Sequence, residues 1–235
     1  MARALPPLLL VGASGFARET AEAVRAVNAT TPTWRLLGYL DDDPARHGSL
    51  VGGLPVLGPI EAVDAHPRAQ VVLCTGRPDN YASRRRLAER LGLSDDRYAT
   101  VIHPTASIGS SCRVGAGSVL LAHVDLTADV VVGRHVAVMP QVVLTHDVHV
   151  DDFATLASGV RVGGGCHIET GSYVGSGACV RERLTVGERA LVGMGAIVTR
   201  DVPTARLWVG APARDVSPAP LPGVRRLRAV RSAGR

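Results

Sequence analysis

The chain has 235 residues, a length that allows two compact domains and excludes three. Of its 26 Lys and Arg residues, five lie in residues 217–235, which contain no acidic residue, and this leaves 21 basic against 21 acidic residues in the rest. The net charge of +5 therefore does not indicate nucleic-acid binding. No apolar run is long enough for a membrane helix, and the start of the chain lacks a signal-peptide pattern, so we expect a cytoplasmic protein without membrane contacts.

The N-terminal residues alternate between apolar runs and helical or turn-forming segments. We expect a strand at 8–11, a glycine turn at 12–15, a helix at 16–27, and further strands at 35–40 and 71–74. Alternation of this kind predicts a small parallel sheet. Residues 1–98 are therefore interpreted as an α/β domain with Rossmann-like winding.

The carboxyl ends of these strands carry the residues that we expect to bind substrate. They are Gly12, Ala13, Ser14 and Gly15 after the first strand, Asp41 and Asp42 after the second, and Gly76 after the third. Glycines let the backbone approach a phosphate at a helix N-terminus, and a carboxylate accepts hydrogen bonds from a ribose, so the pattern favours a nucleotide. A plain strand-to-helix turn explains the glycines equally well, and Asp41-Asp42-Asp43-Pro44 is also a good turn sequence.

A six-residue period runs from Ile102 to Val198. Every sixth residue in this range is aliphatic, at seventeen successive positions, the residue two places earlier is often small, and a glycine often follows directly. This period fits neither the 3.6-residue turn of an α-helix nor simple strand alternation, and it predicts a β-solenoid.

The repeat resembles that of the hexapeptide-repeat family of left-handed parallel β-helices, in which three hexapeptides form one triangular coil of 18 residues. The resemblance implies an all-β left-handed parallel β-helix over residues 99–215. Its glycines are expected where the chain turns a corner, with φ > 0 or without side-chain bulk. The Pro- and Arg-rich residues 216–235 are interpreted as a disordered tail.

An α/β domain followed by a hexapeptide β-helix resembles the sugar O- and N-acyltransferase family over about residues 8–215. The sequence carries Gly12-Ala13-Ser14-Gly15, Tyr39-Leu40-Asp41-Asp42, Ile102-His103-Pro104, Thr145-His146-Asp147 and Val209-Gly210-Ala211-Pro212-Ala213 as the marks of this likeness. In the family, the histidine of a His-acid pair is the catalytic base and the adjacent acid supports the imidazole. The resemblance implies these roles for His146 and Asp147.

The chemistry of acetyl transfer agrees with this assignment. The nucleophile that attacks a thioester must lose a proton, and an imidazole can take it at neutral pH. Asp147 can support His146 only where the two lie at a turn, because side chains alternate faces along a strand. An 18-residue coil places Gly164 above His146, where the family uses a glycine amide to hold the thioester oxygen, although an ordinary corner glycine is the alternative.

The family also implies acetyl-CoA as the co-substrate, bound between adjacent β-helices of a homotrimer near the final coils and the closing loop. Gly193 and Gly210 are the expected contacts there. Thr155 takes the place of a histidine that helps to bind acetyl-CoA in many members, and Met139 takes the place of an asparagine. These departures leave the geometry of donor binding open.

The histidines of the repeat give one rival base and no metal site. His149 is the rival to His146, and the two are expected on opposite faces. His123, His135 and His167 are expected at exposed strand positions. No metal is predicted, because the histidines lack the spacing of zinc-binding β-helices and the four cysteines lack zinc-type spacing.

The leading hypothesis is therefore an acetyl-CoA-dependent N-acetyltransferase that acts on the amino group of a nucleotide-linked amino sugar. The same scaffold supports O-acetylation of a sialic acid or another sugar hydroxyl. The changes at Met139 and Thr155 suggest a further alternative, a non-catalytic trimeric scaffold.

Overall fold

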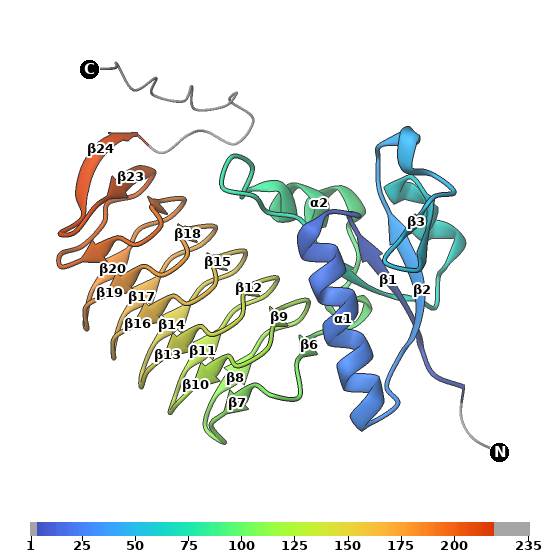
Figure 1. Cartoon of the computed structure of the whole chain (residues 1–235), viewed down its shortest axis with the longest axis horizontal. Helices are drawn as coiled ribbons and strands as arrows, with labels where there is room; N and C mark the ends of the chain where they lie inside the picture. Colours follow the sequence, from blue (N-terminus) through green and yellow to red (C-terminus); the bar gives the residue numbers. More distant parts are fainter. Residues whose placement is uncertain (1–3, 219–235) are drawn as a thin grey trace, which may run out of the picture.

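A computed structural model describes residues 4–218, in which a small α/β part precedes a parallel β-helix (Figure 1). The strands of the first part are β1 (Pro7–Val11), β2 (Arg35–Leu40), β3 (Leu50–Val51), β4 (Leu54–Gly58) and β5 (Gln70–Leu73). Its helices are α1 (Gly15–Thr30) and α2 (Ser83–Leu91), with short 3-10 helices η1 (Pro44–Arg46), η2 (Ile60–Ala65) and η3 (Asp95–Arg97). The expected strands and the expected helix are confirmed: the strand at 35–40 has the expected ends, and the ends of the others differ by at most three residues.

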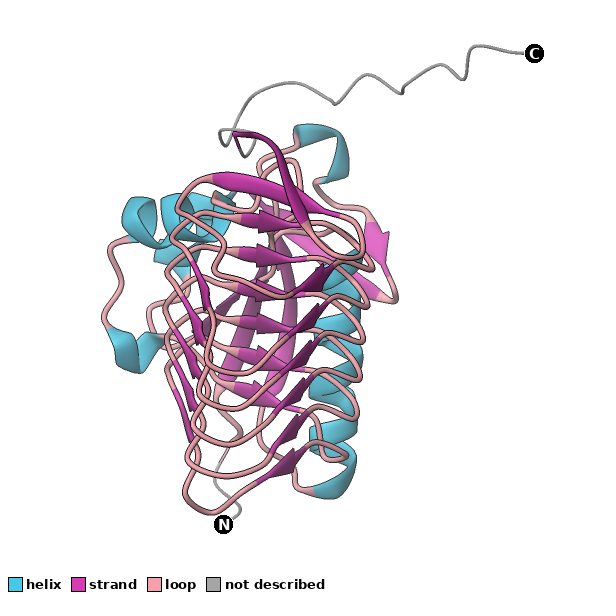
Figure 2. Ribbon diagram, turned by 90° about the vertical axis from the view of Figure 1, so that its left-hand side faces the viewer, coloured by secondary structure: helices cyan, strands magenta, loops and turns pink. Residues whose placement is uncertain are grey.

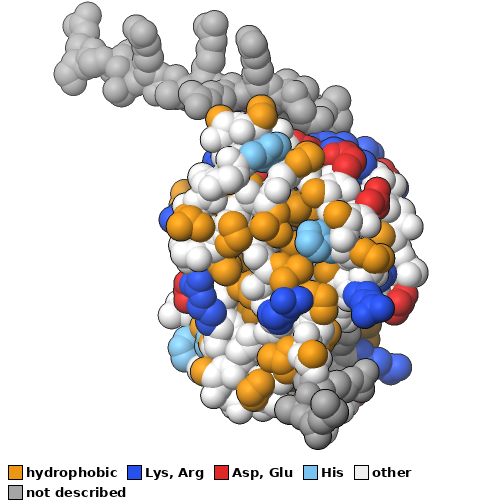
Figure 3. Space-filling model, turned by 90° about the vertical axis from the view of Figure 1, so that its right-hand side faces the viewer, with side chains coloured by type: hydrophobic (Ala, Val, Ile, Leu, Met, Phe, Trp, Pro, Cys, Tyr) orange, Lys and Arg blue, Asp and Glu red, His pale blue; other side chains and the backbone are white. Residues whose placement is uncertain are grey.

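The N-terminal strands form one sheet in the order β3-β4-β2-β1-β5. Neighbouring strands are parallel except for β3 and β4, which form an antiparallel hairpin. Gly52 and Gly53 connect the hairpin with φ values of 55° and 76°, the left-handed conformation that a two-residue turn of this kind requires. On the outer side of this part, hydrophobic side chains lie between basic groups (Figure 3), and Leu50 of the hairpin is 71% exposed.

Alternation along β1 fills two cores. Leu8 and Leu10 face α1, and this cluster continues into Val119 and Leu121 of the first β-helical coils. Leu9 and Val11 point to the other side of the sheet, where η2 and α2 cover them. Helix α1 therefore lies between the sheet and the start of the β-helix (Figure 1).

Seventeen two-residue strands build the β-helix, and they stack into three faces (Figure 2). The first face contains β6 (Val101–Ile102), β9 (Val119–Leu120), β12 (Ala137–Val138), β15 (Thr155–Leu156), β18 (Tyr173–Val174) and β21 (Leu191–Val192). The second face contains β7 (Ser107–Ile108), β10 (Asp125–Leu126), β13 (Val143–Leu144), β16 (Arg161–Val162), β19 (Cys179–Val180) and β22 (Ile197–Val198). The third face contains β8 (Arg113–Val114), β11 (Val131–Val132), β14 (His149–Val150), β17 (His167–Ile168) and β20 (Thr185–Val186).

The coil length predicted from the sequence is confirmed by the strand register. Parallel partners are 18 residues apart, as in the pairs Val143–Arg161 and His149–His167. Each of the seventeen aliphatic positions is the second residue of a strand, and those from Leu120 onward are buried in one continuous core. Short aliphatic side chains fill this core. Each coil adds one level of inward-pointing side chains, and the interior of a three-sided coil is narrow.

The corners differ in one respect from the expectation. The glycine that directly follows a repeat position is needed for space, since a Cβ on Gly163 would lie 2.6 Å from the Glu182 amide nitrogen of the next coil. Positive φ occurs two residues later, and non-glycine residues such as Asp147 (59°) often adopt it. The need for space and the need for a positive φ, both expected of the corner glycines, thus occur at two different positions of the corner.

The expectation that His135 occupies an exposed strand position is wrong. His135 lies at a corner with a φ of 54° and is 3% exposed. Its ring stacks on Phe153 and meets Tyr98 edge-on, with ring centroids 5.1 and 4.4 Å apart. The docking of the N-terminal part covers this corner, and the repeat pattern alone does not reveal that contact.

The last coil is closed by two longer strands, β23 (Arg206–Val209) and β24 (Arg214–Pro218), which are antiparallel. Residues 216–218, expected to begin a disordered tail, belong to β24. The remainder of the expected tail lies outside the described residues. Within residues 4–218, no helix has both the length and the apolar character needed to cross a bilayer.

Candidate active site

His146 and Asp147 occupy the corner between β13 and β14, where the second and third faces meet. The left-handed conformation of Asp147 turns its carboxylate back to the preceding ring, and His146 Nδ1 lies 2.8 Å from Asp147 Oδ2. The condition set by the sequence, that the two residues lie at a turn, is therefore met. A carboxylate on Nδ1 selects the tautomer that leaves Nε2 free to accept a proton.

Gly164 lies next to the other edge of the imidazole, one coil further along. A Cβ added to Gly164 would lie 2.5 Å from His146 Nε2, so only glycine leaves room for the ring in this position. The Gly165 amide donates to the His146 carbonyl at 2.9 Å, whereas the Gly164 amide has no acceptor among residues 4–218. An N–H group beside the free nitrogen of a base can stabilise a developing oxyanion.

A cavity of about 550 Å³ opens in front of this corner, lined by His146, Gly164, Arg181, Glu182 and Arg183. The side chains of His146 and Asp147 are 68% and 64% exposed, so a substrate can approach them from solvent. The two arginines belong to the coil above Gly164 and bring positive charge to the cavity. The arrangement combines a base, an amide donor and cationic side chains, which suits a reaction with an anionic substrate.

The other residues expected to bind the cofactor lie elsewhere on the β-helix. Thr155 is on the first face and is 4% exposed, and its hydroxyl accepts a hydrogen bond of 2.7 Å from Arg84. Gly193 and Gly210 lie together at the closing end, where a Cβ on Gly193 would lie 2.7 Å from Val209 Cγ1. Their roles in cofactor binding stay predictions, and of the four residues expected to bind the cofactor, Gly164 is the one that lies beside His146.

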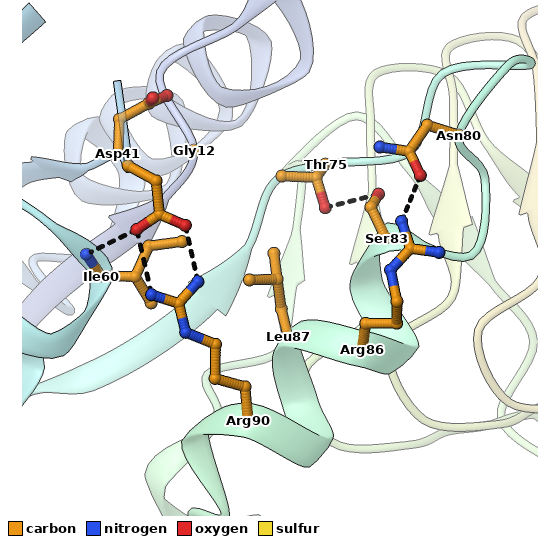
Figure 4. A pocket seen from close by; sticks show the side chains of 10 residues that line it. Gly12, Asp41, Ile60, Thr75, Asn80, Ser83, Arg86, Leu87 and Arg90 are labelled. Atoms are coloured by element: carbon orange, nitrogen blue, oxygen red, sulfur yellow. Dashed lines mark hydrogen bonds and ion pairs between the residues drawn. The ribbon is translucent and has the colours of Figure 1, made fainter. Parts of the chain in front are cut away.

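A second cavity, of about 450 Å³, lies at the carboxyl edge of the N-terminal sheet (Figure 4). Gly12, Asp41 and Asp42 line it, as expected of substrate-binding residues. Gly12 has a φ of 98°, and a Cβ there would lie 2.9 Å from Thr75 Cγ2, so the turn requires glycine. The sheet edge therefore holds a real hollow where the sequence predicted a ligand.

The two aspartates already have partners within the chain. Asp41 accepts hydrogen bonds from the Ala13 and Asp43 amides at 2.8 and 3.0 Å. The Asp42 carboxylate accepts a hydrogen bond of 2.6 Å from the Arg90 guanidinium, and this hydrogen bond lowers the pKa of the Asp42 carboxyl. Asp41 thus fixes the glycine turn, while Asp42 holds Arg90 at the edge of the cavity.

The remaining residues expected at this site border the cavity without lining it. Ala13 and Ser14 connect β1 to α1, and Gly15 is the first residue of the helix. The Ser14 side chain makes no capping hydrogen bond. Gly76 follows the lining residue Thr75, and a Cβ on Gly76 would collide with the Arg84 guanidinium.

Sequence reasoning missed the contribution of α2 to this cavity. Arg86 and Arg90 both extend from α2 toward it, Arg90 to the Asp42 carboxylate and Arg86 to Asn80 (Figure 4). Ser83, also on α2, donates to the Thr75 hydroxyl at 2.9 Å. The signal was the spacing of four residues between Arg86 and Arg90, which places both on one side of a helix after the third predicted strand.

The two cavities lie on opposite sides of the β-helix in one chain. The N-terminal part packs against the first face, through Arg84 on Thr155, and against the corner between the third and first faces, through Tyr81 on the Arg189 carbonyl. His146 is at the corner between the second and third faces, which is the corner opposite the first face. The N-terminal cavity and His146 of the same chain therefore lie beside different parts of the β-helix, and no residue lines both cavities.

Comparisons with known proteins give sugar N-acetyltransferases among the relatives. No family model matches the sequence. UDP-N-acetylbacillosamine N-acetyltransferase of Bacillus subtilis (strain 168) is 35% identical over 115 residues, or 48% of this chain. The matched segment spans 50% of that enzyme, so the comparison covers about half the length of the curated relative.

Two solved structures resemble the chain over about nine tenths of its length. The acetyltransferase domain of PglB from Neisseria gonorrhoeae FA1090 has a TM-score of 0.79 and 28% identity, covering 90% of this chain and 100% of that one. GDP-perosamine N-acetyltransferase from Caulobacter crescentus, a histidine-to-alanine mutant solved with CoA and GDP-perosamine, has a TM-score of 0.78 and 26% identity. It covers 91% of this chain and 98% of that one.

Fold and comparisons together define the class of protein that this chain resembles. Both solved relatives are sugar N-acetyltransferases or acetyltransferase domains, and the likeness extends over the N-terminal part as well as the β-helix. The PglB domain has also been solved with acetyl coenzyme A. The reaction of this class, transfer of an acetyl group to an amine, requires a base, and His146 is a candidate for it.

Proposed function

We propose that the protein is an acetyl-CoA-dependent N-acetyltransferase that acts on the amino group of a nucleotide-linked amino sugar. The observation that carries the proposal is the arrangement of His146, with the Asp147 carboxylate on Nδ1 and Gly164 packed beside Nε2. The relatives with bound CoA and GDP-perosamine or acetyl coenzyme A support the same reaction.

In the proposed reaction the substrate amine attacks the carbonyl carbon of the thioester. As the C–N bond forms, His146 Nε2 takes a proton from the nitrogen, and Asp147 stabilises the imidazolium through Nδ1. The Gly164 N–H donates to the oxyanion of the tetrahedral intermediate. The C–S bond then breaks, and the thiolate of CoA leaves with the proton returned by the imidazolium.

The N-terminal part supplies the site for the nucleotide in this proposal. The domain of residues 1–98, with Rossmann-like winding, holds the nucleotide in the cavity between Gly12 and α2. Arg86 lines this cavity and the amino end of α1 borders it, and both attract the phosphates, because the first amides of a helix favour anions. The left-handed β-helix of residues 99–215 carries the catalytic corner.

Assembly as a homotrimer completes the site. The nucleotide cavity and His146 are on opposite sides of one β-helix, so the sugar must meet the base of a neighbouring copy. The cleft between adjacent β-helices then binds CoA, and Gly193 and Gly210 lie near the end of this cleft that is formed by the last coils. The proposed location of the protein is the cytoplasm. A closed ring of three identical contacts satisfies this arrangement in every subunit.

A mass-spectrometric assay tests the reaction. Acetyl-CoA is combined with UDP-, dTDP- and GDP-linked amino sugars, and wild type is compared with His146→Ala and with the matched control His66→Ala, which changes a histidine that lines neither cavity. We expect a product heavier by one acetyl group with wild type and with the control, and none with His146→Ala. Acetylation of hydroxyls alone indicates O-transfer, and failure to bind or acetylate any substrate indicates a scaffold.

A further inference from the structure

The third face of the β-helix carries two histidines and an aspartate that the proposed reaction does not use. His149 on β14 and His167 on β17 are paired in register on adjacent parallel strands. Asp151 follows His149 by two residues. Residues i and i+2 of a strand point to the same face, and residues paired across strands lie side by side, so the backbone brings the three side chains together.

The donor atoms of the three side chains lie close enough together to bind one metal ion. His149 Nε2 is 3.2 Å from Asp151 Oδ1, and His167 Nε2 is 3.0 Å from the same oxygen. One donor atom from each residue lies within 4.8 Å of the others. Tetrahedral zinc with bonds of ~2.0–2.1 Å separates neighbouring donors by roughly 3.3 Å, so small side-chain rotations suffice to admit the ion.

The chemistry of the donor set favours zinc. Two imidazoles with one carboxylate is a combination that binds Zn²⁺ with a water at the fourth position. Oxygen-seeking ions such as Mg²⁺ and Ca²⁺ require more oxygen donors than Asp151 offers. The side chains of His149, Asp151 and His167 are 53%, 27% and 44% exposed, so an ion can enter directly from solvent.

The backbone beneath the cluster is already fixed by the β-helix. The amides of His149 and Asp151 donate to the Cys166 and Ile168 carbonyls at 2.9 and 2.8 Å, and the amide of His167 donates to the Leu184 carbonyl at 2.9 Å. Only the side-chain torsions remain to be set when an ion binds. The loss of conformational entropy on binding is small for that reason.

We propose that His149, Asp151 and His167 form a zinc site on the third face of the β-helix. The site is separate from the proposed acetyl transfer and does not depend on it. His149 lies three residues after His146, and His167 lies three residues after Gly164. The ion therefore joins the two coils that carry the base and the amide, and it strengthens the contact between them.

The test uses the full-length protein, stripped of metal with EDTA and then dialysed against Zn²⁺. Bound zinc is measured by elemental mass spectrometry. In a second sample Co²⁺ replaces Zn²⁺, and the visible absorption of the bound cobalt gives the coordination number. We expect one zinc per wild-type chain, a four-coordinate cobalt spectrum, and a melting temperature that rises with added Zn²⁺. His149→Ala, His167→Ala and Asp151→Asn should lose all three properties.

His66→Ala is the matched control, because it removes a half-buried histidine outside the β-helix and should leave zinc binding unchanged. Absence of zinc from dialysed wild type overturns the proposal. Binding that survives in His149→Ala and His167→Ala also overturns it, since the ion then sits elsewhere. Asp151→Asn keeps the side-chain volume, so its loss of zinc with an unchanged metal-free melting temperature separates loss of a ligand from loss of the fold.

Discussion

The buried guanidinium of Arg84 donates a hydrogen bond of 2.7 Å to the hydroxyl of Thr155 and so joins α2 to the first face of the β-helix. It also donates to four backbone carbonyls, those of Thr75, His135, Phe153 and Ala154, at 2.7 to 2.9 Å. Among residues 4–218 no carboxylate forms an ion pair with it, and burial lowers the pKa of Arg84 to about 10, which still leaves it protonated at neutral pH. Thr155 thus takes part in the docking of the two parts of the chain.

Replacement of Arg84 by alanine should loosen that docking. The change leaves buried carbonyls without a donor, and we expect a loss of about 3–5 kcal/mol in the free energy of unfolding. Thr155→Val removes a single acceptor and should cost about 1–3 kcal/mol. Urea unfolding followed by circular dichroism measures both.

Arg85→Ala provides the control for this experiment, because Arg85 is the neighbouring arginine of α2 and its side chain is 49% exposed. We expect a change within about 0.5 kcal/mol for it. Equal stability of the Arg84 and Arg85 variants would contradict the role of Arg84 as the link between the two parts.

The repeat and the corner of His146 could be predicted from the sequence because both follow from local order. A period of six residues fixes the faces and the stacking of Gly164 on His146 once the coil length is known. The contact between the N-terminal part and the β-helix joins residues far apart in the sequence, and no repeat in the sequence indicates it. The burial of His135 depends on how the N-terminal part packs, and the sequence shows that Arg86 and Arg90 share one side of a helix but not that this side faces the cavity.

The burial of His135 should make the protein sensitive to acid. Burial, with the nearby Arg134 and Arg84, lowers the pKa of the His135 imidazole to about 4. The folded state therefore keeps His135 neutral, while the unfolded chain takes up a proton below its ordinary value of ~6.5. The stability that this group contributes is complete above that value and falls as the pH drops toward 4, by about 2 kcal/mol at pH 5.

Urea unfolding of wild type and His135→Gln at pH 7.5 and at pH 5 measures this effect. Carboxyl groups whose pKa is lowered, such as that of Asp42, titrate in both proteins and cancel in the comparison. The variant should lose about 2 kcal/mol less than wild type between the two pH values. An identical loss in the two proteins would show that His135 titrates normally.

Gly164→Ala should disable the proposed reaction without unfolding the protein. The added Cβ would lie 2.5 Å from His146 Nε2, and the ring, which is largely exposed, can swing away at little cost in stability. A base displaced by about 1 Å can lose roughly 100-fold in rate. The steady-state rate of acetyl transfer should therefore fall by a large factor, while the melting temperature should fall only slightly.

A double variant distinguishes this mechanism from general damage. If Gly164→Ala acts through the imidazole and the oxyanion site that adjoins it, adding it to His146→Ala should reduce the remaining rate far less than it reduces the wild-type rate. Full additivity of the two effects would argue that Gly164 and His146 act independently.

Arg183 should bind the phosphates of CoA. It lines the cavity in front of His146 with Arg181, and the co-substrate is an anion. Arg183→Ala should raise the KM for acetyl-CoA roughly fivefold, about 1 kcal/mol, with little change in kcat. Arg161→Ala, on the exposed second face, is the control and should leave the KM unchanged. A fall in kcat alone would instead place Arg183 near the reacting atoms.

Two variants, each impaired in a different half of the proposed site, should restore activity to each other when mixed. Arg86→Ala/Arg90→Ala damages the N-terminal cavity, and His146→Ala removes the base on the opposite side of the β-helix. In mixed trimers made by co-refolding or co-expression, an intact cavity of one subunit can face an intact His146 of the next.

Random mixing of equal amounts of the two variants should give about one quarter of the wild-type activity, because each site then needs an intact half from each of two neighbours. The assay uses a low concentration of nucleotide sugar, at which the cavity variant is least active alone. Mixed trimers identified by native mass spectrometry that remain inactive would show that cavity and base act within one chain, which would require the N-terminal part to leave the first face of its own β-helix.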